Sequence, residues 1–352
     1  MPKFDAARTA CNPDGEGIRD GAAYWAVDAG SRPVMADGSL YNVVGTDTGR
    51  SDLAGRNPVT AEQRFRTHVS GPIPNRPPTA DDGRVFLTSY EVTQAFDADS
   101  GERAWRVGEL ESINHPAVSG GSVFVSGRRV ADDQPVVQAR APDDGALLWT
   151  ESRVRESHVM PALGPETLFV ASRGGIQAMD RATGELRFST AYDGRPGSPP
   201  VVSDGSVFLV VWTAERGLLL KLDADSGTQA WTAPVTESNL VVGADTVYVV
   251  KEGGLVAIGK RDGEPVAAGL TDVVPVAAVG SALYAHDFDT LYAFDRENGL
   301  EERWSMTFPT WGHHLRVSIS GVTAVSGAVY VANGPVLVAL GPADGVSGAP
   351  GD

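Results

Sequence analysis

Short segments in which apolar and polar residues alternate recur along the whole chain, and each carries an aromatic residue at its second or third position. Alternation with a period of two predicts β-strands, because successive side chains of a strand point to opposite faces, whereas a helical solenoid needs a period of 3.6. There are eight such segments: LYNVVG (40–45), RVFLTS (84–89), SVFVSG (122–127), TLFVAS (167–172), SVFLVV (206–211), TVYVVK (246–251), ALYAHD (282–287) and AVYVAN (328–333).

The flanks of these segments repeat as well. Before each segment lies a short strand that ends in a tight turn, and Asp-Gly or Gly-Gly pairs in these turns supply the positive φ of a hairpin. After each comes a third strand, a turn and a fourth strand. The aromatic residues of the eight segments are 36 to 46 residues apart. A four-stranded repeat of this length is typical of a β-propeller blade.

The clearest copies of the third strand, turn and fourth strand share an aspartate, a glycine and a large aromatic ring. We expect the aspartate to accept hydrogen bonds from the turn's backbone amides and the glycine to adopt a conformation that other residues avoid. The ring is expected to pack against the neighbouring blade. These copies are QAFDADSGERAW (94–105), QARAPDDGALLW (138–149), QAMDRATGELRF (177–188), LKLDADSGTQAW (220–231) and YAFDRENGLEERW (292–304).

The pattern A-x-D-x-x-[TS]-G-x-x-x-W resembles the repeat of the pyrroloquinoline-quinone (PQQ)-type β-propeller family, over about residues 22–341. That family includes quinoprotein alcohol dehydrogenases and the BamB-like scaffold of the outer-membrane β-barrel assembly machinery, and this chain looks most like the BamB-like branch. The opening DAARTACNPDG is similar to the lead-in of haloarchaeal members. Two copies depart from the pattern: 257–267 lacks the aspartate and the tryptophan, and 37–69 is irregular, with a Gly-rich excursion at 45–60.

The number of strands predicts how the ring closes. The last copy, 328–345, ends before a fourth strand, whereas AAYWAVDAG (22–30) is a fourth strand without a blade, with Trp25 in the tryptophan position. We therefore expect an all-β chain that forms a single eight-bladed β-propeller of four-stranded antiparallel blades, closed by the N-terminal strand completing the last blade. The expected divisions are an N-terminal arm (1–21), the propeller (22–345) and a flexible tail (346–352).

Composition narrows the possible partners and locations. Hydrophobic residues make up 42% of the 352 residues, enough for a core, and the formal charge of −16 disfavours nucleic acid. Only four lysines accompany 25 arginines, which suits either a high-salt habitat or a G+C-rich genome. No apolar run is long enough for a membrane span and no signal peptide is evident, so the sequence predicts a cytoplasmic monomer, or an exported one if a leader was removed.

Polar loops lead into the innermost strands and should ring one mouth of the channel. Converging arginines and histidines there would bind a small anionic ligand or a protein, although solvated loops that only satisfy strand ends fit the sequence too. A competing surface is the excursion 45–60, which has the composition of a mobile loop. The candidate binding residues in the loops are Arg76, His115, His158, Arg195, His314 and Arg316.

The resemblance implies one enzymatic alternative. In quinoprotein dehydrogenases the quinone lies between a tryptophan and a disulfide of two adjacent cysteines, beside a calcium ion, but this chain has Cys11 alone. Neither PQQ nor calcium, and no catalytic or metal-binding residue, is therefore expected. A carbohydrate- or peptide-active propeller is the other alternative, and it needs facing carboxylates that the inner strands largely lack. The sequence predicts a non-catalytic scaffold that binds a protein or a small anionic ligand.

Overall fold

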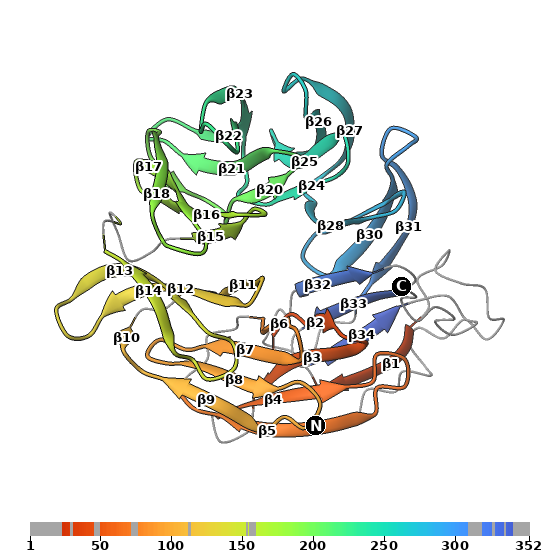
Figure 1. Ribbon diagram of the computed structural model, residues 1–352. Coiled ribbons are helices and arrows are strands. Elements are labelled where there is room, and N and C mark those ends of the chain that lie inside the picture. The colour runs from red at the N-terminus through yellow and green to blue at the C-terminus, as the bar shows by residue number, and fades with distance from the viewer. Residues whose placement is uncertain are drawn as a thin grey trace.

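The computed structural model describes residues 23–28, 31–45, 50–71, 77–111, 114–152, 154, 160–308, 319–325, 328–333 and 336–340. Their secondary structure is all β, and the strands form eight antiparallel sheets arranged in a ring (Figure 1). The first strands of neighbouring blades contact one another around the ring, as β2 contacts both β6 and β32. The predicted eight-bladed propeller is confirmed.

The strands of the first four blades follow chain order. Blade 1 contains β2 (Val34–Ala36), β3 (Ser39–Gly45), β4 (Ser51–Arg56) and β5 (Gln63–Val69). Blade 2 contains β6 (Thr79–Asp81), β7 (Arg84–Thr88), β8 (Thr93–Asp97) and β9 (Arg103–Val107). Blade 3 contains β10 (Leu110–Glu111), β11 (Ala117–Ser119), β12 (Ser122–Arg129), β13 (Gln134–Arg140) and β14 (Leu147–Glu151). Blade 4 contains β15 (Met160–Leu163), β16 (Thr167–Ser172), β17 (Gly175–Asp180) and β18 (Leu186–Ala191).

The remaining blades complete the ring. Blade 5 contains β19 (Arg195–Pro196), β20 (Val201–Ser203), β21 (Ser206–Trp212), β22 (Gly217–Asp223) and β23 (Gln229–Val235). Blade 6 contains β24 (Leu240–Val242), β25 (Thr246–Lys251), β26 (Gly254–Gly259) and β27 (Pro265–Thr271). Blade 7 contains β28 (Val274–Val279), β29 (Ala282–His286), β30 (Thr290–Asp295) and β31 (Glu301–Thr307). Blade 8 contains β32 (Ile319–Val325), β33 (Ala328–Asn333), β34 (Val336–Leu340) and β1 (Ala23–Asp28).

Blades 3 and 5 each contain an extra two-residue strand, β10 and β19, which is left out when the strands of a blade are counted from first to fourth. With that numbering, the second strand of every blade is one of the eight alternating segments read from the sequence. Its aromatic residue is nearly or fully buried in each case, because the face that carries it packs between two neighbouring blades. Eight separate hydrophobic clusters, one for each junction between blades, form the core. The alternation in the sequence therefore marks strands that are covered on both faces.

The first strand closes the ring, as the sequence predicted. β1 pairs antiparallel with β34, so that Trp25 lies opposite Ala339, and the two strands are side by side in Figure 1. The Trp25 ring lies 5.9 Å from the ring of Tyr330, and its Nε1 donates a hydrogen bond to the carbonyl oxygen of Pro58 in blade 1. β1 thereby completes blade 8 and joins it to blade 1.

An aromatic ring joins each regular blade to the next. The ring of Trp105, in the fourth strand of blade 2, lies on Gly145 in the turn of blade 3, where an added Cβ would be 2.8 Å from the ring. Its Nε1 donates to the carbonyl oxygen of Pro142 in the same turn, at 2.7 Å. Gly145 has φ +73°, so both its backbone conformation and the ring above it require glycine. The same joint is formed by Trp149 with Gly184, Trp231 with Gly263, Phe65 with Gly101 and Phe188 with Gly227.

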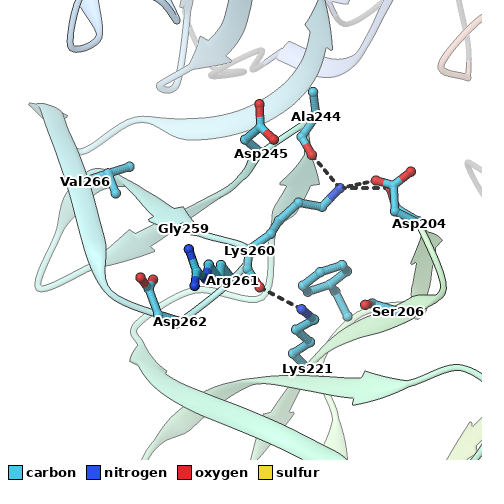
Figure 2. Close-up of a pocket in the computed structure, with 12 residues that line it drawn as sticks. Asp204, Ser206, Lys221, Ala244, Asp245, Gly259, Lys260, Arg261, Asp262 and Val266 are labelled. Carbon is cyan, nitrogen blue, oxygen red and sulfur yellow. Dashed lines mark hydrogen bonds and ion pairs between the residues drawn. The ribbon is translucent and has the colours of Figure 1, made fainter.

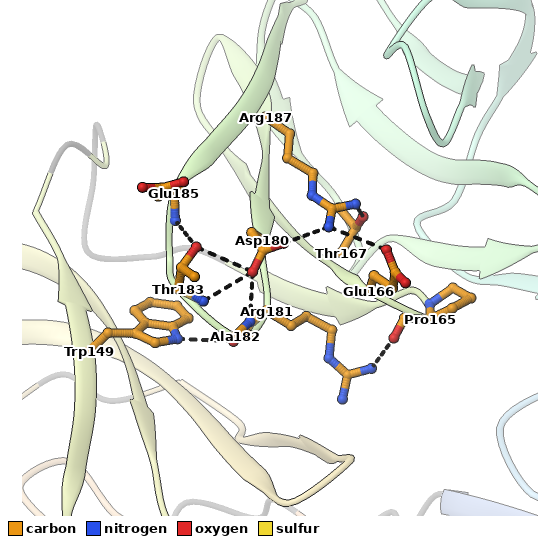
Figure 3. Close-up of polar contacts among 10 residues, drawn as sticks. All are labelled: Trp149, Pro165, Glu166, Thr167, Asp180, Arg181, Ala182, Thr183, Glu185 and Arg187. Carbon is orange, nitrogen blue, oxygen red and sulfur yellow. Dashed lines mark hydrogen bonds and ion pairs between the residues drawn. The ribbon is translucent and has the colours of Figure 1, made fainter.

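The turn aspartates bind backbone amides as expected. Asp180, in the turn of blade 4, accepts hydrogen bonds from the amides of Ala182 and Thr183, and its other carboxylate oxygen is 2.6 Å from the Arg187 guanidinium (Figure 3). The bond from Arg187, followed by the amide bond from Thr183, lowers the pKa of Asp180 to about 2. The carboxylate therefore holds this turn in its ionised form.

Blade 1 corrects the prediction of a mobile loop at 45–60. Residues 51–56 form β4, in which Leu53 and Ala54 are fully buried, while 46–49 lie outside the described residues. Asn57 takes the place of the turn aspartate and accepts hydrogen bonds from the amides of Val59 and Thr60. Ala61, with φ +61°, takes the place of the glycine. The blade is regular, but its turn uses residues that the repeat pattern does not contain.

We predict that the closing strand is essential for stability. Trp25→Ala should cost about 3–5 kcal/mol, because it removes a buried ring and its hydrogen bond to blade 1. Deleting residues 22–30 should cost more, since blade 8 then has an open edge. The midpoint of urea unfolding measures both. Tyr90→Ala, which truncates a half-exposed ring in the turn after β7, is the control and should leave the midpoint unchanged.

We also predict a pH-dependent contribution from Asp180. Its pKa is about 2 in the fold and roughly 3.9 in an unfolded chain, so the stabilisation is present above about pH 4 and is lost as the pH falls towards 2. The difference in unfolding free energy between the wild type and Asp180→Asn should accordingly shrink between pH 4 and pH 2. Asp193→Asn, in the loop after β18, controls for the change in net charge. A difference that stays constant with pH would contradict the assignment.

Candidate functional site

Four of the six candidate loop residues, Arg76, His158, His314 and Arg316, lie outside the described residues. His115 precedes β11 in blade 3. Its Nε2 is 3.0 Å from the carbonyl oxygen of Pro77 and 3.3 Å from the hydroxyl of Thr79, so the ring joins blade 3 to blade 2. Arg195 begins β19 in blade 5 and its side chain is exposed. The convergence of the six residues on one mouth stays a prediction.

The structure has a cleft of about 600 Å³ between blades 5 and 6. It is formed by turns between first and second strands and between third and fourth strands. Because antiparallel strands alternate in direction, these turns lie at the end of the blades opposite the blade-connecting loops. The cleft is therefore on the other face of the ring from the predicted site. Its lining is Ser203, Asp204, Ser206, Phe208, Lys221, Ala244, Asp245, Gly259, Lys260, Arg261, Asp262 and Val266 (Figure 2).

Lys260 fastens the two blades together on one side of this cleft. Its ammonium donates to the carboxylate of Asp204 at 2.7 Å and to the hydroxyl of Ser203 at 2.9 Å, both in blade 5. Carbonyl oxygens of Gly243 and Ala244 in blade 6 lie at 2.8 and 2.9 Å. Figure 2 shows the ammonium between these groups. With four acceptors around three N–H bonds, Lys260 is saturated and serves as an interblade clamp.

The same position of the repeat carries a cation in two other blades. Arg181 lies over the ring of Phe124, and Arg296 over the ring of Tyr248, just as Lys260 lies over Phe208. Both arginines also donate to backbone carbonyl oxygens of the turns they cross. The Lys260 ammonium holds the pKa of Asp204 below its ordinary value, with a further contribution from the Ser203 hydroxyl. These cations are structural, and they explain why charged residues are buried at the junctions.

Two departures from the repeat, Lys221 and Gly259, line this cleft, and a third, Ala267, lies in the adjoining strand β27. Lys221 stands in β22 where the aligned positions of the other blades hold alanine or glycine, and its ammonium donates to the Lys260 carbonyl oxygen at 2.8 Å. Gly259 stands where most other turns have aspartate or asparagine, as Ala141 does in blade 3, and Ala267 stands where other fourth strands have an aromatic ring. The losses in 257–267 are evident from the repeat pattern, whereas Lys221 stands out only when the third strands of all blades are aligned position by position.

Leu300 fills the space left by the missing aromatic ring. It is an extra residue in the turn of blade 7, nearly fully buried, and its backbone has φ +66°. Leu300 packs with Leu255 and Ala267 of blade 6, and its Cβ lies 3.5 Å from the Cβ position of Gly269. Blades 6 and 7 are thus joined by an inserted leucine instead of a ring, which leaves β27 with small side chains.

β27 is an unusual edge strand. Each blade presents its fourth strand at the outer wall, and exposed edges normally carry charges or proline that prevent pairing with other chains. Every other described fourth strand contains a charged residue or an internal proline. β27 contains no charged residue, and its proline stands at its first position. Val266 is 62% exposed and Leu270 41% exposed, and Val266 also lines the cleft. The β27 edge and the cleft together form one continuous surface, here called the blade 6 edge site.

Comparison with known proteins identifies the family. The family model described as outer membrane protein assembly factor BamB matches residues 12–140 and 132–272. The chain belongs to this family. The propeller and its PQQ-like repeats, first inferred from the turn motif, agree with this membership.

Individual relatives are distant. The chain is 27% identical over 179 residues to the outer membrane protein assembly factor BamB of Moranella endobia, which covers 47% of this chain and 45% of that protein. The chain spans about half the length of the curated relatives it matches. The crystal structure of BamB from Moraxella catarrhalis has a TM-score of 0.69 at 16% identity, covering 90% of this chain and 96% of that one.

The fold is shared with an enzyme as well. Quinohemoprotein alcohol dehydrogenase from Comamonas testosteroni has a TM-score of 0.68 at 12% identity, covering all of this chain and 79% of that one. At such identity the likeness concerns the fold alone.

Four tryptophans of the fourth strands join neighbouring blades. Trp25, Trp105, Trp149 and Trp231 each donate their indole N–H to the next blade. Within the described part of the chain, no three His, Cys, Asp or Glu side chains come together as a metal-binding group. The same residues include no helix that is long and apolar enough to cross a membrane.

Proposed function

We propose that this protein is a non-catalytic scaffold that binds a protein partner at the blade 6 edge site. The observation that carries the proposal is the uncharged edge of β27, in the blade whose fourth strand has Ala267 in place of the aromatic ring. A rigid ring of blades holds this edge in a fixed conformation, so little backbone entropy is lost when a partner binds. The second possible function is the binding of a small anionic ligand by the candidate loop residues at the channel mouth. The described residues support this function less.

Family membership supports a protein partner. The description of the family names an assembly factor for outer membrane proteins. By that analogy we also propose that the chain works outside the cytoplasm, the second of the two locations considered from the sequence. The identity of the partner does not follow from the analogy, because the matched relatives are distant and only about half covered.

Site-specific photocrosslinking in cells that naturally make the protein tests the proposed surface. A benzophenone amino acid in place of Val266 should give a discrete adduct, and mass spectrometry should identify its second component as a protein. The same amino acid in place of Ala104, an exposed residue of the charged edge strand β9, is the matched control. Equal adducts from both positions, or none from position 266, would overturn the proposal for this surface.

We further propose that the chain works without PQQ or calcium, since its single cysteine cannot form the disulfide that supports the quinone in the enzymes it resembles. The midpoint of thermal unfolding at high salt should be the same with and without PQQ plus calcium. No quinone absorbance should accompany the protein through gel filtration. A raised midpoint with quinone that co-elutes would instead establish the quinoprotein alternative.

A further inference from the structure

We propose that the blade 6 edge site binds an extended segment of the protein partner as a fifth strand along β27. We propose in addition that this segment has an uncharged, β-forming centre flanked by lysine or arginine. The inference rests on the proposed function and names the chemistry of the partner. Its two parts, backbone pairing and charge at the ends, come from separate features of the strand.

Backbone pairing follows from the position of β27 in its sheet. Within the described residues β27 pairs only with β26, so its outer row of N–H and C=O groups faces away from the blade. An added strand satisfies such a row with main-chain hydrogen bonds, and its side chains supply the selectivity. The pairing with β26 shifts register twice, between Pro265 and Ala267 and between Ala268 and Thr271. Ala267 and Ala268 are paired in register between these shifts, and Val266 beside them adjoins the cleft, so the added strand is expected to pair along this part of β27.

The charges at the ends of β27 select the partner. Glu264 precedes the strand and Asp272 follows it, and both side chains are exposed. Asp245 and Asp262 add carboxylates to the cleft beside Val266, against one exposed cation, Arg261. The formal charge of the whole chain, −16, has the same sign. Lysine or arginine at the ends of the added strand therefore meets opposite charge, and acidic residues meet like charge.

The two lysines of the cleft do not reverse this preference. Lys260 is saturated by its acceptors in blades 5 and 6. The ammonium of Lys221 donates to the Lys260 carbonyl oxygen, as Figure 2 shows. The cationic groups are thus directed between the blades, whereas the carboxylates of Asp245 and Asp262 belong to residues at the surface.

A second copy of this chain fits the edge poorly. If two copies paired their β27 strands antiparallel about Ala268, Glu264 of each copy would lie opposite Asp272 of the other. Like charges directly opposite each other destabilise a strand pair, and two chains of charge −16 also repel. The edge therefore favours a different chain with basic ends.

Synthetic peptides test both parts of the inference. The probe is acetyl-Lys-Thr-Val-Thr-Val-Thr-Lys-amide with a fluorescent label, titrated with the full chain and followed by fluorescence anisotropy. One matched peptide has glutamate in place of both lysines, and another has alternate backbone amides N-methylated along one edge. We expect the glutamate peptide to bind about fivefold to tenfold more weakly. We expect N-methylation to weaken binding by about tenfold or more, because each lost main-chain bond adds to the loss.

Substitutions in the chain locate the binding. Glu264→Lys combined with Asp272→Lys should reverse the preference, so that the glutamate peptide binds better than the lysine peptide. Val266→Lys should weaken binding of the lysine peptide, because it places a charge on the edge at an exposed position. Glu302→Lys, on the exposed edge strand β31 of blade 7, is the control for net charge and should leave the preference unchanged.

The outcomes separate this inference from the proposed function. Equal binding of the N-methylated and parent peptides, unchanged preference in the double variant, or no binding of either charged peptide at millimolar concentration would each overturn the added-strand inference. A discrete protein adduct at position 266 would still stand in that case. Loss of that adduct, by contrast, would remove the surface on which both proposals rest.

Discussion

The contact between an aromatic ring and a glycine holds this ring of blades together. In a regular junction the fourth-strand ring lies on the turn glycine of the next blade and, where it is an indole, donates to a carbonyl oxygen of that turn. The contact buries a large apolar surface and satisfies a buried N–H in one step. Trp25, at the beginning of the described chain, likewise donates to a turn carbonyl oxygen of the next blade, so closure of the ring uses the indole bond of the regular junctions.

Blade 6 shows what happens where this contact is replaced. Without an aromatic ring at Ala267, the junction to blade 7 relies on the inserted Leu300. At the junction with blade 5, Lys221 of blade 5 donates to the Lys260 carbonyl oxygen, and Lys260 of blade 6 donates to Asp204. Stability is supplied from the two neighbouring blades, and the outer strand of blade 6 keeps small, uncharged side chains. A strand that does not have to join its neighbours is free to present its edge to another molecule.

Much of the architecture was predictable because it is a repeating local pattern. The eight alternating segments and the turn aspartates follow from short-range periodicity, and the closing strand follows from an N-terminal fourth strand without a blade and a last copy without a fourth strand. Blade 1 was misjudged because Asn57, Ala61 and Phe65 reproduce the turn with different residues. The residues of this turn do not match the repeat pattern, although its backbone geometry is that of the other turns.

The candidate site could not be predicted in the same way. The alignment of repeats contains Lys221 and the uncharged β27, but their significance depends on which turns meet across the junction of blades 5 and 6. His115 was a plausible ligand-binding residue in the sequence, whereas in the fold its ring contacts Pro77 and Thr79.

The sequence by itself determined the number of blades, their strands and the closure of the ring, because seven blades are encoded by contiguous residues and the eighth is completed by the one N-terminal strand left over. Only the tertiary structure decided which blade offers a free edge and a cleft. Those features arise between segments that are far apart in the chain, where packing, and not local periodicity, sets the geometry.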